Sequence, residues 1–246
     1  MKAVIAILLA LTLGVSGAPN ATAPEEEVSL NSIRLDFADG LEPLTDEEIA
    51  GIQTYYLTAS SDGVEEFRSA ILEQVSDYYK DKELYNATPE GFFENYGFRM
   101  FTFSGSAVFL VYENEMYEIP GFHGYNSTSF AVSDVDGDGY NELYFVFTKG
   151  AGMIWDNVGY FDTKDKTIKH FDYMYDYIFL LGVDEDGGIG VYYPRYSMRV
   201  DELPWPMNES YTPYAKIFDI VFDGNEITLA SVNDDYTEAH RHGSRG

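Results

Sequence analysis

The chain has 246 residues, and a hydrophobic fraction of 45% supplies enough apolar material for one large domain or for a small domain with an appendage. Its 42 acidic residues outweigh 15 lysines and arginines, and the formal net charge of −27 disfavours nucleic acid and anionic membranes as partners and favours cations. The chain has no cysteine, which excludes thiol chemistry and disulfides.

The N-terminal residues have the layout of a secretory signal peptide. Lys2 precedes a mainly apolar run over residues 3–13, and Val15 and Gly17 match the small-residue rule for cleavage. The run is short for a membrane span, although an uncleaved N-terminal anchor stays open as an alternative. We therefore expect a secreted, extracellular protein with no membrane span after removal of residues 1–17.

Two segments precede the predicted β-domain. Residues 18–44 contain prolines, small residues and a run of glutamates, and they are predicted to form an acidic flexible stalk. Residues 45–96 are predicted to form a helical segment, whose first helix begins with a capping box made by Thr45 and Glu48.

A second helix in this segment is predicted from apolar residues at three- and four-residue spacing. It should begin after the SSDG start signal and end near Lys82. Its apolar face comprises Val64, Phe67, Ala70, Ile71, Val75 and Tyr78.

From Gly97 onward the apolar period changes to two, which is typical of strands separated by Gly, Asp and Asn turns. The spacing favours an antiparallel meander over residues 97–235, so the expected fold class is α+β, mostly β, with N-terminal helices. Residues 236–246, which include His240 and His242, are expected to form a disordered tail.

A faint internal repeat runs through the predicted meander. FAVSDVDGDGYNELYFVF followed by VGYFDTKDKTI is similar to IFLLGVDEDGGIGVYY followed by DIVFDGNEITL. Such units would be like propeller blades, but two or three are too few to close a propeller, which needs at least about four. An open sheet or a sandwich of two sheets is therefore expected.

The stretch SDVDGDGYNELYF concentrates like charges on one short turn. Counting from Asp134, the other acids are Asp136, Asp138 and Glu142 at positions three, five and nine, with Tyr140 at position seven. A bound cation would remove their mutual repulsion, and calcium takes about six to eight hard oxygens in loose geometry. Ca²⁺ is therefore the predicted cofactor, and an acidic hairpin that holds only water is the alternative.

A helix–loop–helix calcium site needs a glutamate at position twelve, which is Phe145 here. DVDGDGYNEL instead resembles the calcium loop of FG-GAP and VCBS-type repeats, which also occurs in many secreted bacterial proteins. The match is close over these ten residues only, and a glutamate stands at position nine where integrin-type repeats have aspartate. The resemblance implies side-chain ligands and one main-chain oxygen at Asp134, Asp136, Asp138, Glu142 and, through its carbonyl, Tyr140.

The repeat counterpart GVDEDGGIG keeps Asp184 and Asp186 but has Gly182 and Gly190 where two of the ligands would align. We interpret it as a plain turn. No catalytic motif is recognised, so no catalytic residue is predicted. His123 is interpreted as a solvated loop residue and His170 as an exposed strand residue.

Two further sets of residues are candidates for surface interactions. Trp205 lies between two prolines and is followed by Tyr211 and Tyr214, and these rings could form a stacking platform for a sugar or a partner protein, or else a rigid connection whose Trp covers the core. Glycosylation sequons, each in a predicted loop and relevant if the source is eukaryotic, begin at Asn20, Asn86, Asn126 and Asn208.

These features favour a secreted, calcium-binding, non-catalytic extracellular or surface module that recognises a glycan or a protein. One alternative is an extracellular hydrolase acting on polysaccharide, because a catalytic carboxylate pair among 42 acids cannot be recognised from sequence spacing alone. The other is an acidic calcium-sequestering protein that uses its whole surface.

Overall fold

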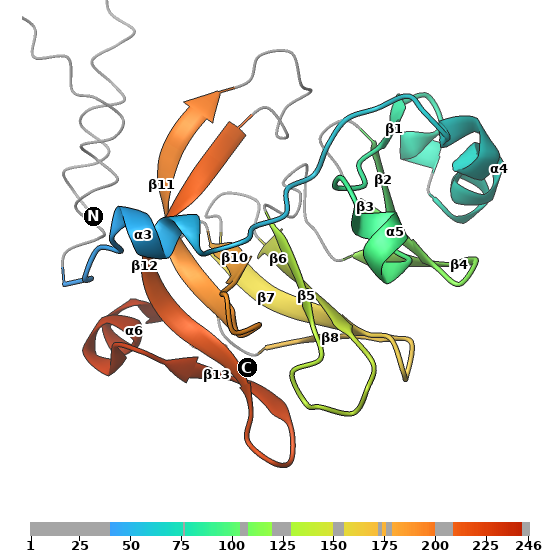
Figure 1. Ribbon diagram of the computed structural model, residues 1–246. Coiled ribbons are helices and arrows are strands. Elements are labelled where there is room, and N and C mark those ends of the chain that lie inside the picture. Colours follow the sequence, from blue (N-terminus) through green and yellow to red (C-terminus); the bar gives the residue numbers. More distant parts are fainter. Residues whose placement is uncertain are drawn as a thin grey trace, which may run out of the picture. The chain divides into compact units, whose positions relative to one another are not determined.

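The computed structural model describes residues 40–75, 77–103, 108–119, 129–149, 155–171, 174–175, 179–199 and 209–242 (Figure 1). The chain divides into two units, Met1–Phe37 and Ala38–Gly246, and every element below belongs to the second. The predicted signal peptide and nearly all of the predicted stalk lie outside the described residues. Of the helices that are described, none is both long enough and apolar enough to cross a membrane.

Three antiparallel sheets form the bulk of the described chain, which confirms the expected fold class. The first is a meander with the strand order β1 (Leu84–Asn86), β2 (Arg99–Phe103), β3 (Val108–Tyr112) and β4 (Glu115–Ile119). The second contains the meander β5 (Phe130–Ser133), β6 (Glu142–Lys149), β7 (Trp155–Asp162) and β8 (Thr167–His170), extended beside β7 by β9 (Met174–Tyr175) and β14 (Arg241–His242). The third is a meander with the order β10 (Leu180–Val183), β11 (Ile189–Arg199), β12 (Glu209–Phe222) and β13 (Ile227–Ser231).

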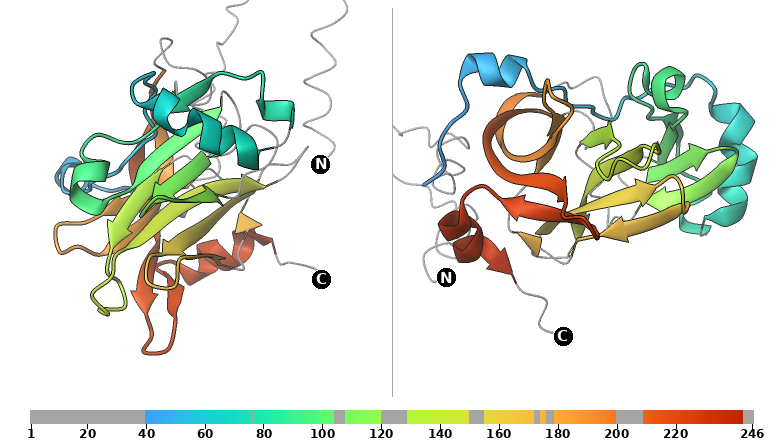
Figure 2. Two further views of the ribbon diagram at one scale, coloured as in Figure 1. Left: turned by 90° about the vertical axis from the view of Figure 1, so that its right-hand side faces the viewer. Right: turned by 60° about the horizontal axis from the view of Figure 1, so that its bottom comes forward.

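The structure repeats one four-stranded unit, as the sequence repeat predicts. Strands β5–β8 and β10–β13 have the same order, and β1–β4 is a third unit of this kind (Figure 2). The last hairpins of the second and third sheets close alike, because the Oδ1 atoms of Asp162 and Asp223 each accept two backbone N–H groups of the turn that follows.

The second sheet is buried on both faces, which places it between the other two. Alternate residues of β6 belong to different apolar clusters, since successive side chains of a strand point to opposite faces. Leu143, Phe145 and Phe147 pack with Met100 and Leu110 of the first sheet. The other face packs against the third sheet in a cluster that includes Ala131, Tyr144, Val146, Val158, Val191, Ala215 and Ile217.

Short helices cover the outer face of the first sheet and accompany the third. α4 (Val64–Gln74) packs Val64 and Ile71 against Phe101, Phe103 and Phe109. The other described helical elements are α3 (Asp46–Ala50), the 3₁₀ turn η2 (Asp77–Tyr79), α5 (Phe92–Tyr96) and α6 (Asp234–His240). α3 begins with the predicted capping box, in which Thr45 and Glu48 bond reciprocally to each other's backbone N–H groups.

The predicted helical segment over residues 45–96 needs correction. α4 ends at Gln74, well before Lys82, because Val75 adopts an extended conformation and turns into the apolar cluster below the helix. Ala70, expected on the apolar face, is exposed. The segment also contains β1, which pairs with β2, so the first sheet begins before Gly97.

The predicted tail over residues 236–246 begins inside α6. The side chain of Tyr236 is 5% exposed and is buried in the apolar cluster between the second and third sheets. Its backbone N–H donates to the side chain of Asn233, just before the helix. An aromatic residue that close to the end of the chain stabilises the helix by burial, which a polar composition alone does not reveal.

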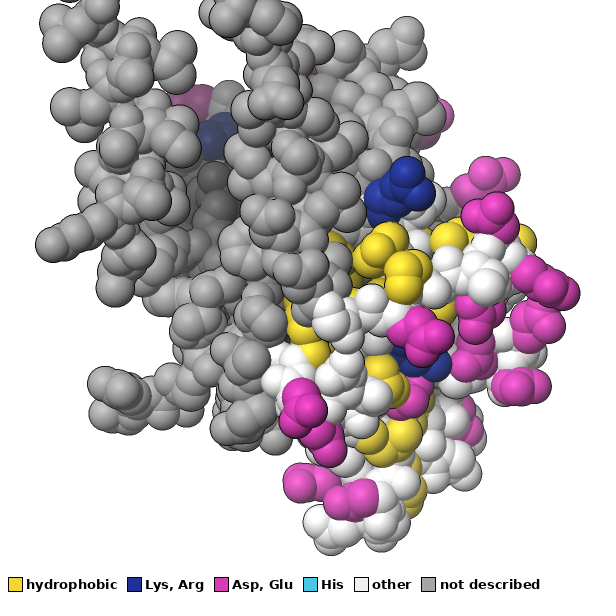
Figure 3. All heavy atoms as spheres, turned by 90° about the vertical axis from the view of Figure 1, so that its left-hand side faces the viewer, with side chains coloured by type: hydrophobic (Ala, Val, Ile, Leu, Met, Phe, Trp, Pro, Cys, Tyr) yellow, Lys and Arg dark blue, Asp and Glu magenta, His cyan; other side chains and the backbone are white. Residues whose placement is uncertain are grey.

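Acidic side chains are spread over much of the described surface in Figure 3, and basic ones are few on that face. This distribution agrees with the net charge of −27.

Candidate metal centre

The acidic loop, residues 134–141, connects β5 to β6, and the strands close directly beneath it with Ser133 paired to Glu142. Two sharp turns shape the loop at Gly137 and Gly139, whose φ angles are +72° and +89°. Only glycine adopts this left-handed region without strain, so the two glycines allow the chain to fold back over its own carboxylates.

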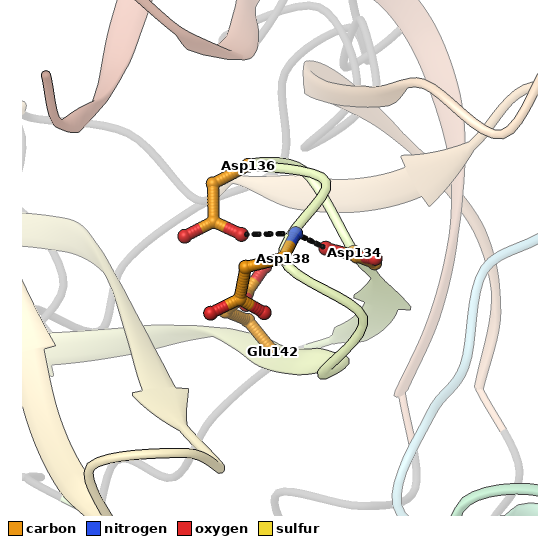
Figure 4. Close-up of side chains that lie close together, drawn as sticks. All are labelled: Asp134, Asp136, Asp138 and Glu142. Carbon is orange, nitrogen blue, oxygen red and sulfur yellow. Dashed lines mark hydrogen bonds between the residues drawn. The ribbon is translucent and has the colours of Figure 1, made fainter. Parts of the chain in front are cut away.

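Four carboxylates meet in this loop. Asp134, Asp136, Asp138 and Glu142 each offer an oxygen atom, and these four atoms lie within 4.8 Å of one another (Figure 4). The three aspartates come from the loop itself and Glu142 from the first position of β6. A set of four acidic oxygens at this spacing could hold a metal ion.

Backbone N–H groups hold the aspartates in place. Asp134 accepts hydrogen bonds from the N–H groups of Asp138 and Gly139 at 3.0 and 2.9 Å. Asp136 accepts from the same Asp138 N–H at 3.1 Å, and Asp138 accepts from Tyr140 at 2.9 Å. The loop is therefore organised by its own main chain, and the oxygen atoms retain lone pairs for a cation.

Glu142 is the buried member of the set, with 3% exposure. Its Oε2 accepts hydrogen bonds from the Val135 N–H at 3.1 Å and the Tyr144 hydroxyl at 3.0 Å. Burial raises the pKa of Glu142 to about 7, the two hydrogen bonds oppose this rise, and the charges of Asp136 and Asp134 add to it. A buried carboxylate among like charges is costly unless a positive charge accompanies it.

The β7–β8 turn supports the acidic loop from the side. The Lys164 Nζ atom lies 2.7 Å from Oδ2 of Asp138, and this contact holds the pKa of Asp138 below its usual value. The Thr163 hydroxyl donates to the Asn141 carbonyl at 2.8 Å.

The sequence did not point to these two residues, because VGYFDTKDKTI stood out only as part of the internal repeat. The meander itself contains the signal that could have found them. In consecutive antiparallel hairpins, the first and third connections lie at the same end of the sheet.

Tyr140 lies in the loop with its ring 50% exposed and its N–H bonded to Asp138. The ligand role of its backbone carbonyl stays a prediction.

The counterpart turn, residues 184–188 between β10 and β11, differs from the alignment made on sequence. The strand pairs that close the two hairpins are Ser133 with Glu142 and Val183 with Ile189, so Asp184 corresponds in position to Asp134. Gly182 and Gly190 pair with each other inside the strands instead of standing at ligand positions. Among the described residues, only the acidic loop brings three or more acidic or histidine ligands together.

The other candidates from the sequence lie apart from this centre. Trp205, Asn20, Asn126, Asn208 and His123 lie outside the described residues.

The two tyrosines near Trp205 differ in their surroundings. Tyr211 is 6% exposed and packs with Leu180 and Tyr192, so its buried ring offers no face for stacking. Tyr214 is half-buried against the apolar cluster between the second and third sheets. Burial on β12 thus favours the structural alternative for Tyr211.

Asn86 is the last residue of β1 instead of a loop residue, and its Nδ2 donates to the Asp62 carbonyl at 3.0 Å. His170 is exposed on β8, as expected.

Comparisons with known proteins identify no relative: no family model, no curated protein and no solved structure matches the chain. The functional assignment therefore depends on the geometry of the acidic loop.

Proposed function

We propose that this chain is a secreted, calcium-binding, non-catalytic module that recognises a glycan or a protein outside the cell. One calcium ion would bind at Asp134, Asp136, Asp138 and Glu142, with the Tyr140 carbonyl as a further ligand. The observation that carries the proposal is the convergence of four carboxylate oxygens within 4.8 Å on one short loop.

The chemistry of the donors favours calcium over other common metals. All four side chains are carboxylates, which suit hard cations, whereas zinc prefers nitrogen and sulfur ligands. Magnesium usually keeps several waters and binds through one or two carboxylates. A loop that supplies four carboxylates is better matched to the larger ion with more ligands.

Calcium would stabilise the fold through the strands that the loop connects. Glu142 begins β6, a strand buried on both faces, so an ion bound to it is attached to the centre of the structure. A ligand that binds only the folded state stabilises it by mass action. For a dissociation constant of roughly 10⁻⁴–10⁻³ M, as in many extracellular sites, about 10 mM calcium contributes about 1.4–2.7 kcal/mol.

Thermal melting in calcium, in magnesium and in chelator tests this proposal. We expect calcium to raise the melting temperature by roughly 3–10 °C, given about 2–4 °C per kcal/mol for a domain of this size, and then to saturate. Magnesium should have a much smaller effect. Equilibrium dialysis should find one saturable calcium ion per chain, whereas binding that keeps rising would favour the calcium-sequestering alternative.

A matched pair of variants locates the site. Asp136→Asn keeps an oxygen that can accept the Asp138 N–H and removes one ligand charge. Asp186→Asn removes the same charge from the exposed counterpart turn. We expect the first to lose most of the calcium response and the second to keep it, and a full response in Asp136→Asn would place the ion elsewhere.

The non-catalytic part of the proposal has its own test. The protein should bind members of a glycan or extracellular-protein array without releasing reducing sugar from a panel of polysaccharides. If the purified chain releases reducing sugar, the proposal of a non-catalytic module is wrong and the alternative of an extracellular hydrolase takes its place.

A further inference from the structure

The guanidinium group of Arg99 lies over two aromatic rings near the outer face of the first sheet. Its Cζ atom is 3.9 Å from the ring centroid of Phe93 on α5 and 5.2 Å from that of Phe67 on α4. Phe67 in turn packs on Phe101 of β2, with the ring centroids 4.8 Å apart. Stacking occupies the faces of a guanidinium group and leaves the N–H donors at its edge available.

Arg99 has no acidic partner among the described residues, although the chain has 42 acids. The contrast with the lysines is clear, because Lys164, Lys169 and Lys216 each lie 2.7 Å from an aspartate oxygen. A planar group with fixed faces and unused edge donors is well suited to bind a carboxylate through two parallel hydrogen bonds.

Arg99 lines a groove of about 470 Å³ that also has apolar and acidic lining residues. Phe67, Phe93 and Phe101 form its apolar wall. Its acidic residues are Asp62, Glu66, Glu90 and Glu94, which are exposed and form no ion pair within the described part of the chain. A second groove of about 390 Å³ shares Phe67, Phe93 and Arg99 with the first, so Arg99 lines both.

We propose that this groove binds a small zwitterion of the α-amino-acid class, about the size of a dipeptide. Arg99 would bind its carboxylate, the acidic residues would attract its ammonium group, and the phenylalanine rings would contact its apolar side chains. A polyanion is disfavoured because four carboxylates line the groove together with the single guanidinium. A simple cation is disfavoured because the positive charge of Arg99 lines the groove.

This inference does not depend on the calcium proposal. No residue of the acidic loop lines either groove. The two proposals can therefore fail separately.

Calorimetric titration of the full chain with three forms of leucyl-phenylalanine tests the charge pattern. The free dipeptide has both charges, its C-terminal amide lacks the carboxylate, and its N-acetyl form lacks the ammonium group. We expect the free dipeptide to bind and each blocked form to bind at least about tenfold more weakly, since a charged hydrogen-bonded pair contributes about 1.5–3 kcal/mol. Equal binding of all three forms, or no binding of the free dipeptide, overturns the proposal.

Variants then assign the carboxylate to Arg99. Arg99→Gln should bind the free dipeptide about 10–100-fold more weakly and no longer distinguish it from the amide, while it still discriminates against the N-acetyl form. Arg195→Gln removes the same charge from an exposed position on β11 and should bind like the parent. Arg99→Lys keeps the charge without the planar fork and should bind with intermediate affinity.

A thermal melting curve of each variant shows whether it is folded. If Arg99→Gln melts like the parent and still prefers the free dipeptide over the amide, Arg99 is not the carboxylate receptor and the proposal fails. If Arg99→Gln does not fold, Arg99→Lys decides instead. If Arg99→Lys prefers the free dipeptide over the amide as strongly as the parent does, the paired hydrogen bonds that define the site are excluded and the proposal fails.

Discussion

Two hairpins of the same repeat end in different chemistry. The β5–β6 and β10–β11 hairpins each pair over four positions, and both are followed by an aspartate, Asp134 or Asp184, that accepts two backbone N–H groups of its own turn. The acidic loop, however, is three residues longer than the counterpart turn over residues 184–188. The turns also touch, because the Ser133 hydroxyl donates to the Gly187 carbonyl at 3.0 Å.

The residue that begins the returning strand makes the difference. After the acidic loop, β6 begins with Glu142, a buried acid, and after the counterpart turn, β11 begins with Ile189, a buried apolar residue. An aspartate at the start of a turn is thus explained by backbone hydrogen bonds alone. The three further carboxylates also accept backbone N–H groups, but such hydrogen bonds do not require four acidic oxygens to lie within 4.8 Å of one another, which is the feature that the proposed cation would explain.

Removing the first aspartate from each turn should give the largest effect. Asp184→Ala leaves two N–H groups without their acceptor, whereas Asp134→Ala leaves only that of Gly139, because the Asp138 N–H keeps Asp136; each lost hydrogen bond should cost about 0.5–1.5 kcal/mol in chelator. In about 10 mM calcium, Asp134→Ala should lose a further 1.4–2.7 kcal/mol, roughly, because the ligand is also gone. Denaturant unfolding with and without calcium measures both, and a calcium response lost equally in Asp184→Ala would contradict the difference between the turns.

A second buried carboxylate separates burial from ligand geometry. Asp156 on β7 is 1% exposed, and it accepts hydrogen bonds from the Thr148 hydroxyl and the Phe179 N–H, both at 2.8 Å. Burial raises the pKa of Asp156 to about 7, and the two hydrogen bonds oppose the rise. The folded state therefore holds a proton that the unfolded state has released between about pH 4 and pH 7.

The contribution of Asp156 to stability should fall as pH rises through this window, by about 2–3 kcal/mol between about pH 5 and pH 8. Asp156→Asn cannot ionise, so the difference in unfolding free energy between the parent and this variant should change by that amount. The calcium-induced rise in melting temperature should stay as in the parent. A calcium response altered by Asp156→Asn would mean that buried charge in general, and not the acidic loop, senses the ion.

The effect of Glu142→Gln on stability should have opposite signs in chelator and in calcium. Its oxygen can still accept from the Val135 N–H and the Tyr144 hydroxyl, while the buried charge is removed. In chelator the variant should melt at the parent's temperature or higher, because a buried charge among like charges no longer opposes folding. In calcium it should lose most of the expected stabilisation of the folded state by the ion, which is about 1.4–2.7 kcal/mol. A variant that melts lower than the parent in both conditions by the same amount would indicate a structural role only.

The β-structure was predictable because its signals are local. Alternating apolar residues and Gly, Asp or Asn turns identify each hairpin, and the spacing of four acids identifies the acidic loop. The helical segment was less predictable. Val75 continues the helical spacing of Val64 and Ile71 yet leaves the helix for the core, so a tertiary contact overrides a local pattern.

The supporting residues of the site could not be found from a motif. Lys164 is 26 positions from Asp138 in the chain and reaches it only because β5, β6, β7 and β8 are consecutive neighbours in one sheet. Likewise, Arg99 looks like any strand arginine until α4 and α5 bring Phe67 and Phe93 to its two sides. Both features depend on how strands and helices assemble, which spacing within one segment does not encode.

Lys164 should give the smallest effect, on affinity more than on stability. Its ammonium group lies on Asp138 and 5.9 Å from the Tyr140 ring centroid, where it competes with a cation for the same carboxylate. Lys164→Gln should therefore leave melting in chelator almost unchanged, because exposed ion pairs contribute little, and should raise calcium affinity by about two- to fivefold at low salt. Lys166→Gln is the matched control in the same turn, since Lys166 pairs with Glu113 and Glu115 instead of the acidic loop. Calcium titrations of both variants at low and high salt measure the effect, which should diminish as salt screens the charge. Weaker binding in Lys164→Gln would instead mean that this lysine holds Asp138 in the geometry that the ion requires.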